Sequence, residues 1–97
     1  MVKLDASNVI LKPSHRRQIL GWLRRPVKMG EQVGDLSIQI SLRRVGRACQ
    51  GEAQVHDKAG RFDCRSRGQH WRDVGRDLAH KIGGHLHDQR LALGKVA

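Results

Sequence analysis

The chain has 97 residues, of which 38% are hydrophobic, and it carries a formal net charge of +10. This length supports one modest hydrophobic core, so residues 1–97 are expected to form a single domain. No apolar run approaches the roughly 20 residues that a membrane-spanning helix needs, and the N-terminus has no apolar segment of signal-peptide length. A soluble cytoplasmic protein is therefore expected.

The basic residues are concentrated in two segments. Residues 12–28 contain six Lys and Arg residues and no acidic residue, and residues 58–67 contain four against a single Asp. Such a surface attracts polyanions, which makes nucleic acid the leading partner class and anionic lipid the second. A solvated charge with no partner is the alternative. Residues 12–28 are the first place to look for a binding surface.

The first two elements are predicted to be a strand and a helix. Val2 and Leu4 alternate with polar residues in the segment 1–5, which indicates a short strand. Pro13 is suited to the first turn of a helix, and Pro26 should end or kink that helix near Arg25. The apolar stripe of the helix consists of Ile19, Leu20 and Leu23, with Trp22 at its border.

A three-stranded meander is predicted next. The segment LSIQISLR at 36–43 alternates strictly between apolar and polar residues. A hairpin tip at 45–46 would set Leu42 opposite Cys49, and a second tip at 58–60 would set Val55 opposite Phe62. The outward face of the last strand would then consist of Arg61, Asp63, Arg65 and Arg67.

A second helix follows residue 68, because apolar residues recur there at spacings of three and four. These residues are Trp71, Val74, Leu78, Ile82 and Leu86. Gly75, Gly83 and Gly84 indicate either close packing on the sheet or fraying beyond residue 83. The predicted fold class is α+β, with the order β-α-β-β-β-α and both helices on one face of a four-stranded, mostly antiparallel sheet.

Neither metal chemistry nor catalysis is indicated by the residue patterns. Cys49 and Cys64 lack the close pairing of a zinc site and are interpreted as buried free thiols, with a disulfide as the alternative that the sequence leaves open. The six histidines show no ligand spacing and are interpreted as solvated. No nucleophile–base pair, phosphate-binding loop or dinucleotide motif is present, so we expect no enzyme activity, no cofactor and no small-molecule substrate.

The remaining mechanism is binding of structured RNA through phosphate contacts and shape. The chain has one Phe, two Trp and no Tyr, which is a weak basis for stacking single-stranded bases. Trp71 is interpreted as a core anchor at the start of the second helix rather than as an exposed stacking platform. Double-helical RNA is recognised largely through its backbone and shape, which suits a basic surface.

The sequence also resembles a known family. Asn8-Val9 before the first helix, the strand LSIQISLRR, and the segment RGQHWRDVGRDLAHKIGGHL resemble the ribosome hibernation-promoting factor and ribosome-associated inhibitor family, also called sigma-54 modulation proteins. The resemblance spans nearly all of the chain. The positions that follow the family's order in the last segment are Gly68, Asp77 or Arg76 near the family's acidic position, Leu78, Lys81, Ile82 and Leu86.

The resemblance implies a short-type family member that binds the small ribosomal subunit and silences translation under stress. It implies the same β-α-β-β-β-α fold, similar to that of double-stranded RNA-binding domains, and family-like basic residues at Arg25, Lys81 and Arg90. Together with the basic positions of both helices, the expected RNA-binding residues are Arg16, Arg17, Arg24, Arg25, Lys28, Arg72, Arg76, Lys81 and Arg90.

Two other functions remain open from the sequence. One is a general RNA- or DNA-binding regulator with this fold and no role at the ribosome. The other is a small partner-binding module with no more than nonspecific affinity for nucleic acid. The sequence leaves the oligomeric state undetermined.

Overall fold

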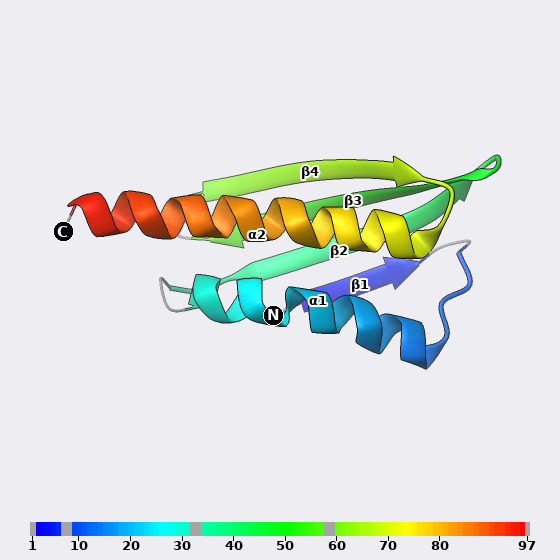
Figure 1. Cartoon of the computed structure of the whole chain (residues 1–97), viewed down its shortest axis with the longest axis horizontal. Coiled ribbons are helices and arrows are strands. Elements are labelled where there is room, and N and C mark those ends of the chain that lie inside the picture. The colour runs from blue at the N-terminus through cyan, green and yellow to red at the C-terminus, as the bar shows by residue number, and fades with distance from the viewer. Residues whose placement is uncertain (1, 7–8, 32–33, 58–59, 97) are drawn as a thin grey trace.

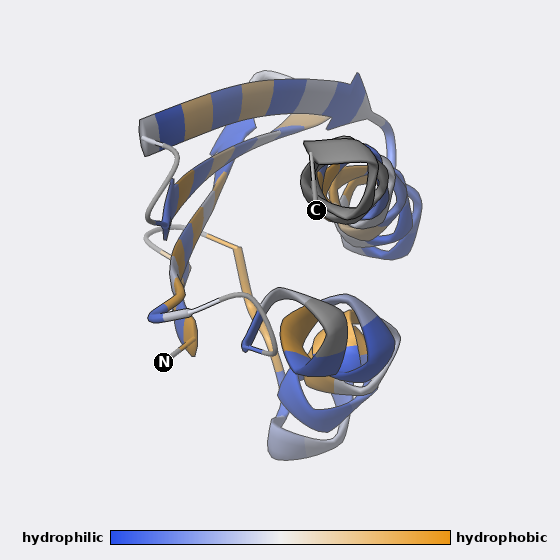
Figure 2. Cartoon of the chain, turned by 90° about the vertical axis from the view of Figure 1, so that its left-hand side faces the viewer, coloured by the Kyte–Doolittle hydropathy of each residue, from blue (hydrophilic) through white to orange (hydrophobic). Residues whose placement is uncertain are grey.

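A computed structural model describes residues 2–6, 9–31, 34–57 and 60–96, with the side chains of 29 and 89–96 left out of the description. The elements are β1 (Val2–Ala6), α1 (Pro13–Glu31), β2 (Ser37–Val45), β3 (Ala48–Asp57), β4 (Gly60–Gly68) and α2 (Trp71–Val96). Both helices lie on the same face of the sheet, and its other face is open (Figures 1 and 2). The predicted order and layering are confirmed.

The four strands lie in the order β1-β2-β3-β4. β1 runs parallel to β2, and the other two pairs are antiparallel, so the sheet is mostly antiparallel as predicted. The register of β3 with β4 is also confirmed, since Val55 lies opposite Phe62.

The predicted register of β2 with β3 is wrong by two residues. Leu42 lies opposite Gly51, and it is Arg44 that lies opposite Cys49. A shift of two residues keeps each side chain on the same face, so the hydrophobic pattern does not distinguish the two registers. The turn distinguishes them, because Gly46 takes the left-handed φ of +61° at the first turn position, where Val45 would be strained.

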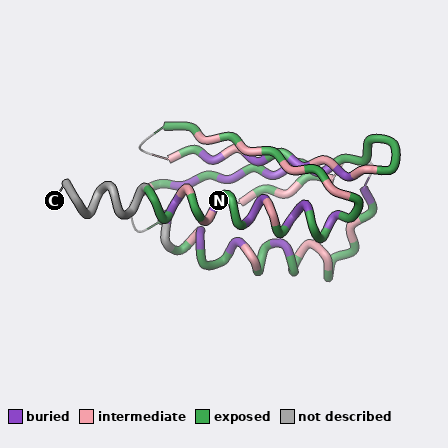
Figure 3. Tube along the Cα trace, turned by 45° about the horizontal axis from the view of Figure 1, so that its top comes forward, coloured by how far each residue is buried: buried purple, intermediate pink, exposed green. Residues whose placement is uncertain are grey.

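The core lies between the sheet and the helices. Buried residues alternate with exposed ones along β2 and with mostly half-buried ones along β3, as Figure 3 shows. The most completely buried large side chains come from α1, β2 and α2: Ile19, Leu23, Ile38, Ile40, Leu42, Leu78 and Ile82. Leu20 is 40% exposed, so its predicted place in the apolar stripe is wrong. It follows Ile19 by one residue and is therefore turned about 100° away from the buried stripe.

Pro26 was predicted to end or kink the first helix, and the first of these alternatives is wrong. α1 continues through Pro26 to Glu31, although proline removes one backbone hydrogen bond from a helix interior. Pro26 is buried, and a Cβ placed on Gly83 of α2 would lie 3.4 Å from its ring. Packing against the second helix therefore offsets part of the cost of the lost hydrogen bond.

Candidate nucleic-acid interface

The two helices approach each other closely because α2 has glycines where it faces α1. A Cβ on Gly75 would lie 3.3 Å from both Ile19 and Trp22, and Gly83 faces Pro26. Close packing thus explains Gly75 and Gly83, although their neighbours belong to α1 rather than to the sheet. Gly84 has open space around it, and the helix continues to Val96. Of the two alternatives left open for these glycines, fraying beyond residue 83 is therefore wrong.

An aromatic stack joins the helices on this shared surface. The His15 ring lies 4.4 Å from the Trp71 ring between centroids, and Trp22 stacks on Trp71 at 6.5 Å. Trp71 is only 7% exposed, which confirms its predicted role in the core. Since their neighbours are protein rings, Trp22 and Trp71 strengthen the helix pair and are poorly placed to stack bases.

Two arginines of α2 lie over this aromatic stack. The guanidinium of Arg72 lies 5.6 Å from the Trp71 ring centroid, and that of Arg76 lies 5.3 Å from the Trp22 ring centroid. Both arginines are exposed. A cation over an aromatic face is held in position without a carboxylate neighbour, so its charge stays available to an incoming anion.

Helix α1 presents its basic residues on two adjoining faces. Arg17, Arg24 and Lys28 are exposed and recur at spacings of seven and four, so they share the face that points away from the sheet. Arg25, also exposed, lies one turn after Trp22 and hence on the side of α1 that faces α2. We call six of the exposed cations of the two helices the helix face: Arg17, Arg24, Arg25, Lys28, Arg72 and Arg76.

The remaining expected site residues have different surroundings. Arg16 is half-buried and donates a 2.9 Å hydrogen bond to the carbonyl of Leu4 in β1. Lys81 donates a 2.7 Å hydrogen bond to the carbonyl of Arg65 in β4 and forms a 3.0 Å ion pair with Asp77. These two cations therefore join the helices to the two edges of the sheet. The side chain of Arg90 lies outside the described residues.

The Asp77 carboxylate takes part in the contact at the β4 edge. Hydrogen bonds from Ser66 and then from Lys81 lower its pKa below the ordinary 3.8. Asp77 is consequently charged at neutral pH and neutralises part of the Lys81 charge. Lys81 therefore differs from the cations of the helix face. Those cations form no ion pair within the described part of the chain.

A basic group that the sequence reasoning did not choose lies on the open face of the sheet. Arg43 and Arg67 both lie opposite Gln50, one on each neighbouring strand. Arg43 was not among the expected site residues, because the resemblance favoured the helix side of the sheet. The signal in the sequence is the run LRRVGR at 42–47, which has three arginines around the β2–β3 turn.

The cysteines have little nucleophilic character. Both are free; Cys49 is buried, as predicted, whereas Cys64 is only half-buried. Burial raises the pKa of both thiols, although Arg44 opposes the shift at Cys49 and Lys81 opposes it at Cys64. The thiols are therefore protonated at neutral pH, and their chemistry does not define a site.

Two of the six histidines are only partly exposed to solvent, which departs from the prediction that they are solvated. His15 is half-buried against Trp71, and His85 is half-buried with its ring stacked on Phe62 at 3.9 Å and an interplanar angle of 6°. Across the described residues, no three His, Cys, Asp or Glu side chains form a group that could hold a metal ion. None of the described helices is long and apolar enough to cross a membrane.

Comparison with known proteins identifies the fold. No family model matches the sequence, and no curated protein sequence matches it. The structure is similar to the N-terminal domain of Protein Y from Thermus thermophilus, with a TM-score of 0.75 and 18% identity over 87% of this chain and 91% of that one. It is similar to a ribosomal subunit interface protein from Coxiella burnetii, with a TM-score of 0.76 and 15% identity over 93% and 97% of the respective chains. The chain therefore has the fold of these two proteins.

Proposed function

We propose that this chain is a non-catalytic ribosome-binding protein of the hibernation type. In this proposal, residues 1–97 form one binding unit that acts in the cytoplasm. The basic side chains of α1 and α2 contact ribosomal RNA of the small subunit, and the bound protein inhibits translation. The observation that carries the proposal is the unpaired basic helix face on a fold shared with a ribosomal subunit interface protein.

The surroundings of the helix-face cations support phosphate binding. Their neighbours are solvent or aromatic rings, as at Arg76, so an approaching phosphate does not have to displace a carboxylate. Phosphate contacts of this kind supply much of the affinity for nucleic acid and make it dependent on salt. The indole rings are stacked within the protein, which favours recognition of an RNA backbone over recognition of unstacked bases.

Sedimentation with purified ribosomes tests the proposal. The protein is mixed with small subunits, large subunits and whole ribosomes at about 0.1 M salt, where the screening length is roughly 10 Å. We expect it to pellet with small subunits and whole ribosomes and to reduce translation in a purified system. Free protein in every supernatant at this salt concentration would contradict the proposal.

The second candidate is a general RNA- or DNA-binding regulatory module without a role at the ribosome. It is favoured by the character of the helix face, because contacts to phosphates carry no sequence information of their own. Competition separates the two functions. If random RNA duplex displaces the protein from small subunits at equal phosphate concentration, the general module is correct, whereas retention on the subunits supports the ribosomal role.

A further inference from the structure

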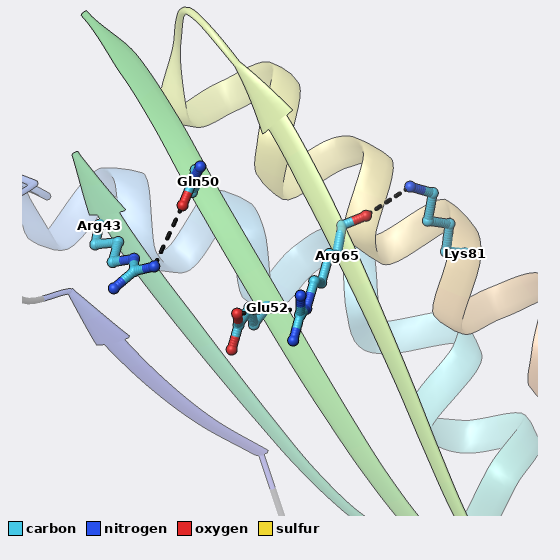
Figure 4. Close-up of polar contacts among 5 residues, drawn as sticks. All are labelled: Arg43, Gln50, Glu52, Arg65 and Lys81. Atoms are coloured by element: carbon cyan, nitrogen blue, oxygen red, sulfur yellow. Dashed lines mark hydrogen bonds and ion pairs between the residues drawn. The ribbon is translucent and has the colours of Figure 1, made fainter. Parts of the chain in front are cut away.

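A second group of arginines lies on the side of the sheet that carries no helix. Arg43 of β2, Arg65 of β4 and Arg67 of β4 are exposed, and they surround Gln50 and Glu52 of β3. These five residues, which we call the sheet-face patch, help to line a hollow of about 330 Å³. Figure 4 shows four of them on one face of the strands, with Lys81 reaching the β4 edge from α2.

The strand register fixes the spacing of these arginines. Arg43 and Arg67 both lie opposite Gln50, and neighbouring strands are about 4.8 Å apart, so their Cα atoms are roughly 10 Å apart. Arg65 lies two residues before Arg67 on the same face, a further distance of about 7 Å along β4. Three guanidinium groups thus emerge from a small rigid area of paired strands.

These guanidinium groups make only weak contacts with other side chains of the protein. Arg43 donates to the side-chain oxygen of Gln50 at 3.4 Å, and Arg65 lies 3.4 Å from Glu52 with 83% of its side chain exposed. An ion pair so exposed contributes little, so it yields readily to a stronger anion. Arg67 has no ion-pair partner among the residues that the structure describes.

The chemistry of this face favours a phosphodiester backbone as its occupant. Guanidinium groups bind phosphate oxygens through paired hydrogen bonds, and the β2–β3 turn brings Arg47 next to the patch. A protein partner would require an apolar centre to its interface. The outward-facing residues of β2–β4 are mostly serines, glutamines and charged residues, and Val45 at the end of β2 is the one large hydrophobic side chain exposed on these described strands. One such residue is a small apolar area for a protein interface, so the surface complements RNA better than it complements a protein.

We propose that the sheet-face patch binds a second RNA segment, so that one chain bridges two segments held on opposite sides of the sheet. The sheet separates the two surfaces, because the residues that alternate with the patch along the strands, such as Leu42, face the helices. The bridging rests on the proposed function, since the helix face supplies the other RNA contact. The patch itself is an independent anion site.

The test uses two samples of one RNA duplex of about 16 base pairs, labelled with a donor and with an acceptor fluorophore. The intact chain at about 50 mM salt should bring the two duplexes together and produce energy transfer. The double variant Arg43→Gln/Arg67→Gln should lose this transfer and still bind one duplex. The matched control Lys3→Gln/Arg61→Gln removes two exposed cations from the other half of the same face and should retain the transfer.

The outcomes test the sheet-face site separately from the proposed function. Transfer that is equal in the Arg43/Arg67 variant and in the control overturns the sheet-face site. Sedimentation must show one protein for two duplexes, because two proteins for two duplexes means association between chains and also overturns it. Binding of a single duplex without transfer rejects the bridge and leaves the proposed function intact. Absence of both duplex and ribosome binding rejects the two together.

Discussion

Basic side chains lie on both the helix face and the open face of the sheet, but their neighbours differ. On the open face, Arg61 lies 3.0 Å from Asp63 and Arg65 lies 3.4 Å from Glu52. On the helix face, Arg76 lies over the Trp22 ring and has no carboxylate partner within the described residues. The net charge of +10 is therefore distributed over two different surfaces. The charges on the open face of the sheet are partly paired, and those on the helix face are unpaired.

The physical origin of the difference is the periodicity of the two kinds of element. Side chains on neighbouring strands lie directly opposite one another, so acidic and basic residues meet in cross-strand pairs. On a helix, the neighbours lie three and four residues apart, and residues 12–28 contain no acid to meet their cations. On the sheet, the segment around the β2–β3 turn, residues 42–47, contains three arginines and no acid.

The largest expected effect comes from a substitution that disturbs the packing of the sheet against α2. A Cβ at Gly51 of β3 would lie 2.6 to 2.9 Å from side-chain atoms of Val74, Leu78 and Leu42. Gly51→Ala should therefore lower the free energy of unfolding by about 1–3 kcal/mol. Gly84→Ala is the matched control, because its Cβ meets nothing within 4 Å and the change should raise stability by about 0.4–1 kcal/mol. Urea unfolding measures both, and equal signs would contradict the packing described here.

The next effect compares the two faces through salt. Arg24→Gln/Lys28→Gln should reduce the slope of log affinity for duplex RNA against log salt by about 1.4–1.8, if each residue contacts one phosphate. A rise from about 50 to 200 mM salt then costs this variant about tenfold less affinity than it costs the original chain. Lys3→Gln/Arg61→Gln, which removes equal charge from the open face, should change the slope much less. Equal slopes in the two variants would exclude α1 from the interface.

A smaller effect concerns the way the helix face holds its arginines. Arg76→Met keeps the aliphatic stem and removes the cation over Trp22. A double-mutant cycle with Trp22→Leu should give a coupling of about 0.5–1 kcal/mol in unfolding free energy. Coupling near zero would mean that the ring does not hold the guanidinium in solution.

The smallest effect concerns the edge of β4. The folded pKa of Asp77 is lowered below 3.8, so the carboxylate stabilises the fold above that pH and the contribution is lost as the pH falls through the folded value. Asp77→Asn should cost about 0.3–0.5 kcal/mol at pH 7, as for other exposed helical pairs, and nothing in strong acid. Urea unfolding of both proteins at pH 7 and in acid checks this; an undiminished difference in acid would contradict it. Lys81→Met should remove part of the same pH dependence, because Ser66 still donates to the carboxylate.

Much of the fold was predictable because it depends on local patterns. Alternation along residues 36–43 and the helical spacing from Trp71 to Leu86 place the apolar residues on the correct faces. The role of the glycines of α2 stayed open in the sequence, because it depends on residues of another helix: Gly75 makes room for Ile19 and Trp22 of α1. The same applies to Pro26, which packs against Gly83 across the helix pair.

The candidate site was predictable in composition but not in arrangement. The sequence by itself determined that residues 12–28 are basic and free of acids, and that the strands alternate between buried and exposed residues. Only the tertiary structure decided which cations are unpaired, because Arg16 and Lys81 bind carbonyls of strands distant in sequence. It also decided, through the turn at Gly46, that Arg43 and Arg67 lie either side of Gln50, since a two-residue shift leaves the hydrophobic pattern unchanged.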